Sequence, residues 1–186
     1  DGQHDVMLFS DGGKAVRFDE NDVRPMGRNA RGVKGMTLDD GQSVIAMLVA
    51  EDEQQSVLTA TINGYGKRTP IGEYTRHGRG TKGMIAIQQS ERNGKVVAAT
   101  LVHAEDEIML ITDTGVLVRT RVSEIRELGR ATQGVILIGL DDGAKLSGLQ
   151  RIVENDANVQ DDAADGAADA EGGDTAGSSD ESGSAE

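Results

Sequence analysis

The sequence predicts an all-β fold made of three copies of one propeller-like unit, followed by an acidic tail. Similar strings recur in the same order, and Val6, Val57 and Ile108 occupy equivalent places 51 residues apart. Within each copy, short apolar runs alternate with Gly-rich and Asp-rich turns, which is the pattern of β-hairpins. A period of this length indicates a solenoid, a propeller or an array of repeats.

The first copy contains two predicted hairpins. Val6–Phe9 and Ala15–Phe18 lie on either side of an SDGG turn, and Met36–Leu38 and Val44–Val49 lie on either side of a DDG turn. Both pairs of runs are rich in residues that favour strands. We therefore expect four strands in this copy, paired two by two.

The other two copies repeat the arrangement. Their predicted turns are Asn63–Gly66, Arg92–Gly94, Asp113–Gly115 and Asp141–Gly143. Four strands per repeat of about 50 residues describe a propeller-like blade. Helical signals are few, and the best of them is a short turn over Val122–Glu127 with Ser123 as a possible N-cap.

The repeats and the composition divide the chain into two parts. We expect three blades over residues 1–154, with bounds near 5–55, 56–107 and 108–154, and a tail over residues 155–186. The tail has no Lys or Arg, and one Val is its only large apolar side chain, so it cannot bury enough surface to fold and should be disordered. Three blades would leave an open arc with exposed sheet edges. The start DGQHD, without Met, also suggests a piece of a longer protein.

Charge and composition exclude several kinds of site. The net charge of −13 divides into −3 for residues 1–154 and −10 for the tail, so the repeats themselves are nearly neutral. Cysteine is absent, which excludes disulfides and Cys-based zinc sites, and three scattered histidines give no basis for expecting a metal site. No apolar run approaches the roughly 18 residues of a membrane span, so we expect a cytoplasmic protein without membrane contact.

The basic residues gather in one phase of the repeat, in the long loop between the two predicted hairpins. They are Arg24, Arg28, Arg31 and Lys34 in the first copy, Lys67, Arg68, Arg76, Arg79 and Lys82 in the second, and Arg119, Arg121, Arg126 and Arg130 in the third. Acids cluster instead between repeats, at Glu51–Glu53 and Glu105–Glu107. If the blades surround an axis, the basic loops fall on one rim, and such a stripe suits a long, bent polyanion.

A solvated surface is the alternative explanation for any one of these loops, but three loops in phase favour a nucleic-acid surface. Readout of bases is not expected, because there is no recognition helix and few aromatic residues. Contacts to phosphates, combined with DNA deformability, fit these residues better. The acidic tail could either keep the protein soluble or compete with DNA for the basic surface.

Two other features resemble a nucleotide-binding site and a catalytic tyrosine, but their surroundings in the sequence support neither function. Gly78–Gly83 matches GxGxxG, yet it leads into an apolar run that resembles a strand, whereas a dinucleotide site opens a helix. We assign Gly35, Gly83 and Gly134, which end the equivalent slots of the three copies, to the turns that start strands. Tyr65 and Tyr74 have no general base or metal cluster beside them, so no catalytic residue is predicted.

Three strings resemble a known family. LTATINGYGKRT, ITDTGVLVRTRVSEI and GRATQGVILI, at residues 58–69, 111–125 and 129–138, are similar to the C-terminal DNA-wrapping domain of the A subunit of bacterial DNA gyrase. The resemblance extends from about Asp5 to Val153, and the tail is similar in character. The related domain of the topoisomerase IV A subunit is the second choice, and a propeller-type protein-interaction module also remains open.

The resemblance implies a β-pinwheel, a propeller-like disc or spiral of six blades that exchange strands with their neighbours. This chain would supply the last three blades and the tail. It would wrap DNA around a basic rim, so that the full A2B2 enzyme, a type IIA topoisomerase, introduces negative supercoils. ATP and Mg would bind elsewhere in that enzyme, and the DNA-cleaving tyrosine would lie in another part of the A subunit. The implied partners are double-stranded DNA, the gyrase B subunit and the rest of the A subunit. The implied location is the bacterial cytoplasm, close to the nucleoid.

We therefore predict a set of DNA-contacting cations. They are Arg28, Arg31, Lys34, Lys67, Arg68, Arg76, Arg79, Lys82, Arg119, Arg121 and Arg130. The family's QRRGGKG box is absent from the chain, and the slots at residues 30–35, 78–83 and 129–134 are degenerate relatives of it.

Overall fold

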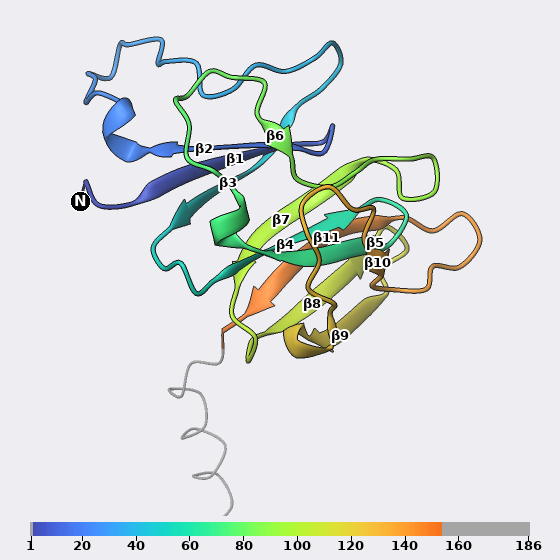
Figure 1. Ribbon diagram of the computed structural model, residues 1–186. Coiled ribbons are helices and arrows are strands. Elements are labelled where there is room, and N and C mark those ends of the chain that lie inside the picture. Colours follow the sequence, from blue (N-terminus) through green and yellow to red (C-terminus); the bar gives the residue numbers. More distant parts are fainter. Residues whose placement is uncertain (1, 154–186) are drawn as a thin grey trace, which may run out of the picture. The chain divides into compact units, whose positions relative to one another are not determined.

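The computed structural model describes residues 2–153, and the tail expected over residues 155–186 lies outside this range. The described residues form antiparallel sheets and three single turns of 3-10 helix, with no α-helix among them. The prediction of an all-β repeat fold is therefore confirmed (Figure 1).

The first sheet has the strand order β3-β1-β2-β6. Its strands are β1 (Asp5–Ser10), β2 (Lys14–Asp19), β3 (Val44–Ala50) and β6 (Met84–Ile85). The expected first hairpin is present, because β1 and β2 pair in antiparallel register. The fourth strand, however, comes from the second repeat.

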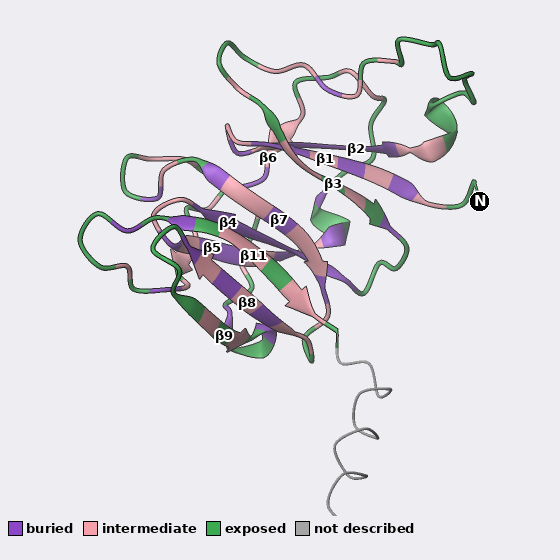
Figure 2. Ribbon diagram, turned by 180° about the vertical axis from the view of Figure 1, so that it is seen from behind, coloured by how far each residue is buried: buried purple, intermediate pink, exposed green. Residues whose placement is uncertain are grey.

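The second sheet repeats this plan, with the order β10-β5-β4-β7. Its strands are β4 (Ser56–Thr61), β5 (Tyr65–Pro70), β7 (Val96–Val102) and β10 (Val135–Ile136). β4 is buried along its whole length, since sheets pack against both of its faces (Figure 2).

The third sheet has only three strands among the described residues, in the order β11-β8-β9. They are β8 (Glu107–Thr112), β9 (Leu117–Arg121) and β11 (Leu146–Ile152). No described strand pairs with the outer edge of β9, and Leu117 on that edge is 60% exposed. Within residues 2–153, the outer edge of β9 is therefore an unpaired sheet edge.

Strand exchange corrects the prediction of a second hairpin in each copy. β6 does not pair with β7, and β10 does not pair with β11. Each short strand instead crosses to the sheet of the preceding repeat. In the first copy, Met36–Leu38 forms no strand and pairs with no other sheet of residues 2–153. It packs on the free face of its own sheet, with Met36 buried beside Val16 and Phe18.

A turn of 3-10 helix follows the second strand of every repeat. These turns are η1 (Glu20–Asp22), η2 (Ile71–Glu73) and η3 (Val122–Glu124). The helical turn expected over Val122–Glu127 is thus shorter than predicted. It is capped by Arg121 without a side-chain hydrogen bond, so the expected N-cap role of Ser123 is wrong.

Two apolar clusters join the sheets. The first lies between the first and second sheets and includes Met7, Phe9, Val57 and Tyr74. The second lies between the second and third sheets, with Leu58 and Leu110 among its members. Because both clusters take residues from two repeats, neighbouring repeats share the core at each joint.

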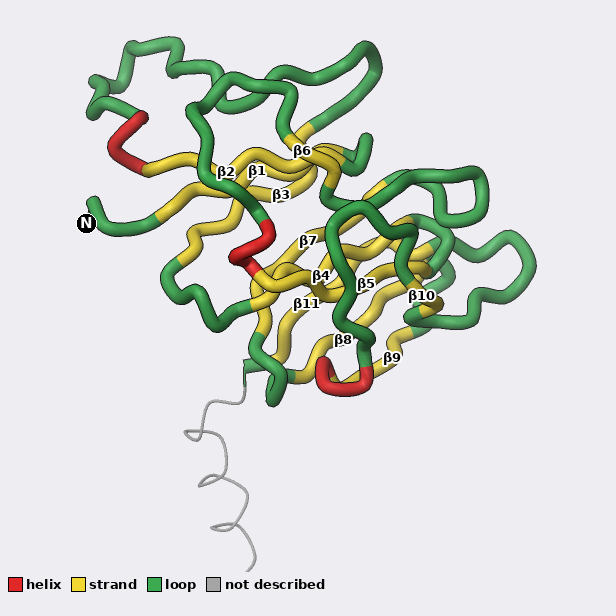
Figure 3. The backbone as a smooth tube through the Cα atoms, viewed as in Figure 1, coloured by secondary structure: helices red, strands yellow, loops and turns green. Residues whose placement is uncertain are grey.

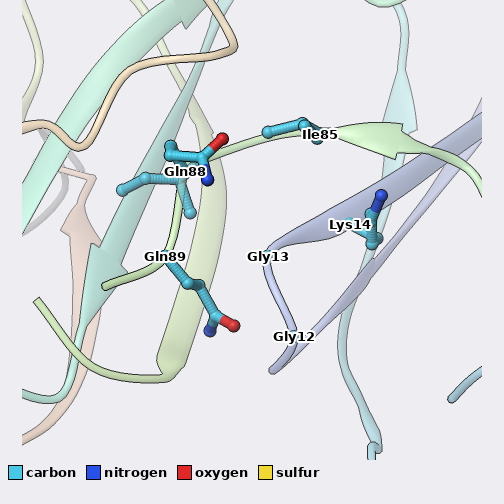
Figure 4. A pocket seen from close by; sticks show the side chains of 7 residues that line it. Gly12, Gly13, Lys14, Ile85, Gln88 and Gln89 are labelled. Atoms are coloured by element: carbon cyan, nitrogen blue, oxygen red, sulfur yellow. The ribbon is translucent and has the colours of Figure 1, made fainter. Parts of the chain in front are cut away.

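The exchanged strands approach the preceding hairpin closely (Figure 4). The carbonyl of Gly13 accepts hydrogen bonds from the backbone N–H groups of Ala86 and Ile87, at 2.9 and 3.3 Å. Gly13 has φ 75°, and a Cβ at this position would lie 2.7 Å from the carbonyl oxygen of Ile87. Glycine is therefore required here by both backbone angle and space.

Candidate nucleic-acid interface

Three long loops carry the basic phase of the repeat. They span residues 23–43, 74–83 and 125–134, and each begins just after a 3-10 turn (Figure 3). The second and third loops end at β6 and β10, in the sheet of the preceding repeat. We call the three loops together the loop band.

Hydrogen bonds connect the loops of neighbouring repeats. Between the first and second loops, Gly80 N–H donates to the carbonyl of Gly35 at 2.6 Å, and Thr37 N–H donates to the carbonyl of Thr81 at 2.8 Å. Beyond β6, Gln88 N–H reaches the carbonyl of Thr132 in the third loop at 2.8 Å. Backbone contacts therefore join the first loop to the second, and the third loop to the segment that follows β6.

The first loop carries the least compensated charge. Its cations Arg24, Arg28, Arg31 and Lys34 are all exposed. Within residues 2–153, no carboxylate lies within ion-pair distance of any of them. Four uncompensated cations on one exposed loop form a surface that attracts anions.

The second loop carries cations that already have acidic partners. Arg76 lies 2.7 Å from Asp5 and 3.3 Å from Asp19, and Lys82 lies 2.7 Å from Asp39. The hydrogen bond between Lys82 and Asp39 raises the pKa of the lysine and lowers the pKa of the carboxyl. The pair of Lys82 and Asp39 is exposed and contributes little stability, so Lys82 can exchange its partner for a phosphate at small cost, whereas Arg76 also compensates the buried carboxylate of Asp5.

Arg79 and Arg130 occupy equivalent places in successive repeats, and each binds backbone carbonyls of the preceding repeat. Arg79 donates through Nε to the carbonyl of Asp22 at 3.0 Å and through Nη1 to that of Lys34 at 3.2 Å. Arg130 donates through Nη1 to the carbonyl of Ile85 at 2.8 Å. Both side chains are only partly exposed, so they shape the loop band as well as adding charge to it.

Lys67 must be removed from the predicted phosphate contacts. Its side chain has no exposed surface, and its ammonium group donates to the carbonyls of Gly129 and Arg130 in the third loop. Burial lowers the pKa of Lys67 to about 8. The sequence suggested that Lys67 lies in a basic loop. It lies instead on β5, and its side chain faces inward and binds backbone carbonyls of the third loop.

Arg68 is also turned toward the joint between repeats. Its Nε donates to the carbonyl of Ile125 at 2.8 Å, and its side chain is 18% exposed. Arg119 and Arg121 lie on β9 rather than in the loop band, and both pair with Glu107. The structure thus separates these three arginines from the exposed loop cations.

The glycines of the slots differ between copies. Gly83 and Gly134 have φ 76° and 80°, and a Cβ on either would lie within 2.6 Å of a carbonyl oxygen in the preceding sheet. Gly35 has no positive φ, since its segment joins no preceding sheet. Two of the three glycines are therefore required by the exchange of strands.

One basic residue of the joint was missed by sequence reasoning. Arg17 is 7% exposed and donates to the carbonyls of Ile71 and Tyr74 in the next repeat. A signal for it was present, because Arg17, Arg68 and Arg119 are spaced by 51 residues like the strands that carry them.

A solvent-open hollow lies between the first hairpin turn and the exchanged strand (Figure 4). It is lined by Gly12, Gly13, Lys14, Ile85, Ile87, Gln88 and Gln89. Apart from Lys14, its side chains do not titrate, so it lacks the acid–base pair that catalysis would require. Among the described residues, no helix is long and apolar enough to cross a membrane.

A family model described as the DNA gyrase C-terminal domain, beta-propeller, matches residues 4–51, 55–103 and 106–152. The DNA gyrase A subunit of Pseudomonas aeruginosa is 51% identical over 89% of this chain and 18% of its own length. The corresponding protein of Escherichia coli K12 is 51% identical over 93% of this chain and 20% of its own length. The chain thus spans about a fifth of the curated relatives that it matches.

Solved structures agree on the fold. A DNA gyrase A C-terminal domain superimposes with a TM-score of 0.75 at 28% identity, covering 81% of this chain and 51% of that chain. A C-terminal domain of DNA topoisomerase IV superimposes with a TM-score of 0.77 at 24% identity, covering 82% and 47%. The second likeness concerns the fold alone, whereas the sequence matches favour gyrase over topoisomerase IV.

Proposed function

The chain belongs to the family of DNA gyrase C-terminal domains, and on that premise we propose that it binds double-stranded DNA along the loop band and bends it. The observation that carries the proposal is the loop band, whose first loop has four exposed cations without acidic partners among the described residues and is bonded to the second loop. Cations that follow one curved line can neutralise successive phosphates of a duplex that bends to meet them.

Within the complete enzyme, the bent DNA would be presented for strand passage with one handedness, so that negative supercoils accumulate. The rest of the gyrase A subunit, together with the gyrase B subunit, would supply DNA cleavage and ATP hydrolysis, with ATP and Mg bound there. This chain would contribute binding and geometry only, in the bacterial cytoplasm beside the nucleoid. The absence of base-reading elements from the described part of the loop band supports binding that is independent of DNA sequence.

The affinity for a duplex is expected to fall steeply with salt. If about six phosphate contacts form, log K plotted against log salt concentration should have a slope near −5. Fluorescence anisotropy of a labelled duplex over roughly 50 to 200 mM salt would measure it, and an unrelated duplex should give the same slope. A slope close to zero would favour a protein-interaction module, in which the exposed edge of β9 at Leu117 would be the contact surface.

We also propose that the acidic tail competes with DNA for the loop band. The tail carries a charge of −10 and no base, so it is itself a polyanion. Deletion of residues 155–186 is expected to raise DNA affinity, and to raise it most at low salt, where charge is least screened. The same anisotropy titration tests this, and equal affinities with and without the tail would leave the tail only a role in solubility.

A further inference from the structure

Arg17 links the first repeat to the second through backbone carbonyls. Its Nη1 donates to the carbonyl of Ile71 at 3.1 Å and to that of Tyr74 at 3.3 Å. On its own side, Nε donates at 2.6 Å to Asp5, whose side chain is 2% exposed, and the guanidinium also pairs with Glu53. The guanidinium group of Arg17 is therefore bonded to both repeats.

The same link recurs one repeat later. Arg68 donates through Nε to the carbonyl of Ile125 at 2.8 Å and lies 3.8 Å from Glu127. Ile125 follows η3 as Tyr74 follows η2, so both arginines bind the residue that ends a 3-10 turn. Adjacent backbone bonds repeat as well, since His77 N–H donates to the carbonyl of Arg17 and Leu128 N–H to that of Arg68, at 2.8 and 2.9 Å.

These links have a property that the apolar clusters lack. Apolar contact fixes how much surface two sheets bury, but it is not directional and permits them to pivot. A hydrogen bond weakens steeply when its angle departs from the preferred range, and the planar guanidinium holds several donors in a fixed geometry. Together with the exchanged strands β6 and β10, Arg17 and Arg68 can therefore fix the angle between sheets whose apolar faces pack together.

Each arginine binds a carbonyl at the first residue of a basic loop. Tyr74 begins the second loop and Ile125 begins the third. An arginine that fixes these residues relative to the preceding sheet also fixes where each basic loop begins. The curvature of the loop band then depends on the two joints.

We propose that Arg17 and Arg68 are positioning residues that set the angle between successive repeats and thereby the path of bound DNA. This inference rests on the proposed function, since it presupposes that DNA follows the loop band. Neither side chain has to touch DNA, because Arg17 is buried and Arg68 is largely buried.

The first test measures the joint without DNA. The chain has no cysteine, so the variants Met47→Cys and Glu91→Cys place two unique spin labels, one in the first repeat and one in the second. The distance distribution between the labels is expected to broaden when Arg17→Met is added. Arg151→Met is the matched control, because it removes an arginine of β11 that pairs at 2.8 Å with Asp106, the residue before β8, in an ion pair that involves no sheet other than the third. If the distance distribution of Arg17→Met is the same as that of the unaltered chain, the inference is overturned, regardless of the result of the DNA-bending test.

The second test uses the whole chain with a duplex labelled at both ends. At saturating protein, Arg17→Met combined with Arg68→Met should lose the short end-to-end distance of bent DNA, while the slope of log K against log salt keeps its value. Arg17→Lys keeps the positive charge but lacks the planar set of guanidinium donors. It should therefore also lose the DNA bend at the joint between the first and second repeats. Arg151→Met should retain the bend.

The outcomes separate the two proposals. If the unaltered chain binds and bends DNA and the double variant bends it equally, the positioning role is wrong and the proposed function stands. If the unaltered chain shows no salt-dependent binding, the proposed function fails, and the DNA part of this inference fails with it.

Discussion

Tyr74→Ala is expected to lower the free energy of unfolding by about 3–5 kcal/mol, the cost of truncating a buried aromatic side chain. Tyr74 is 1% exposed and belongs to the cluster between the first and second sheets. Its ring meets that of Phe9 edge to face, with centroids 5.9 Å apart and planes at 72°. The truncation would open a cavity in the joint, where two repeats share one core. Urea unfolding followed by circular dichroism measures the loss.

Tyr74→Phe is the matched control for this prediction. The hydroxyl of Tyr74 is buried without a hydrogen-bond partner among the described residues, and burial raises the pKa of this hydroxyl well above its usual range. A buried polar group without a partner costs free energy, so its removal should leave stability unchanged or slightly higher. A loss in Tyr74→Ala no larger than in Tyr74→Phe would show that the joint does not depend on this ring.

The strands were predictable where pairing is local. β1 and β2 form a hairpin around Gly13 because both strands and their turn lie within one short stretch of sequence. The second hairpin was mispredicted because Met84–Ile85 pairs with β2, a strand of the preceding repeat. Alternation of apolar residues identifies a strand but not its partner, and a DDG or NG turn beside it suggests the wrong one.

The interface was predictable to a similar extent. Charge that segregates by phase of the repeat is visible in the sequence, which is why the exposed loop cations were found. Burial is not visible in the same way. Lys67 and Arg68 belong to a basic string but lie on β5, where one faces the interior and the other the joint. Arg17 was overlooked because a lone arginine between apolar neighbours resembles an ordinary outward-facing strand residue.

The combined variant Arg28→Ala, Arg31→Ala and Lys34→Ala is expected to cause the largest loss of DNA affinity. Each phosphate contact contributes about 0.9 to the salt slope, so three lost contacts should reduce its magnitude by about 2.7. At about 0.1 M salt this corresponds to roughly 500-fold weaker binding, if such contacts contribute little near about 1 M. The three side chains are exposed and have no acidic partner among the described residues, so the fold should not change.

The control removes the same charge from the opposite phase of the repeat. This control variant combines Arg92→Ala, Lys95→Ala and Lys145→Ala. The three residues lie in or beside the turns that precede β7 and β11, outside the loop band. Both triple variants change the net charge equally, so long-range attraction to DNA is matched and only local contacts differ. Anisotropy titrations at several salt concentrations should show a reduced slope for the loop variant and a nearly unaltered slope for the control. Equal losses in both would mean that DNA responds to net charge and not to a defined path, and the loop band would lose its assignment as the DNA-binding surface.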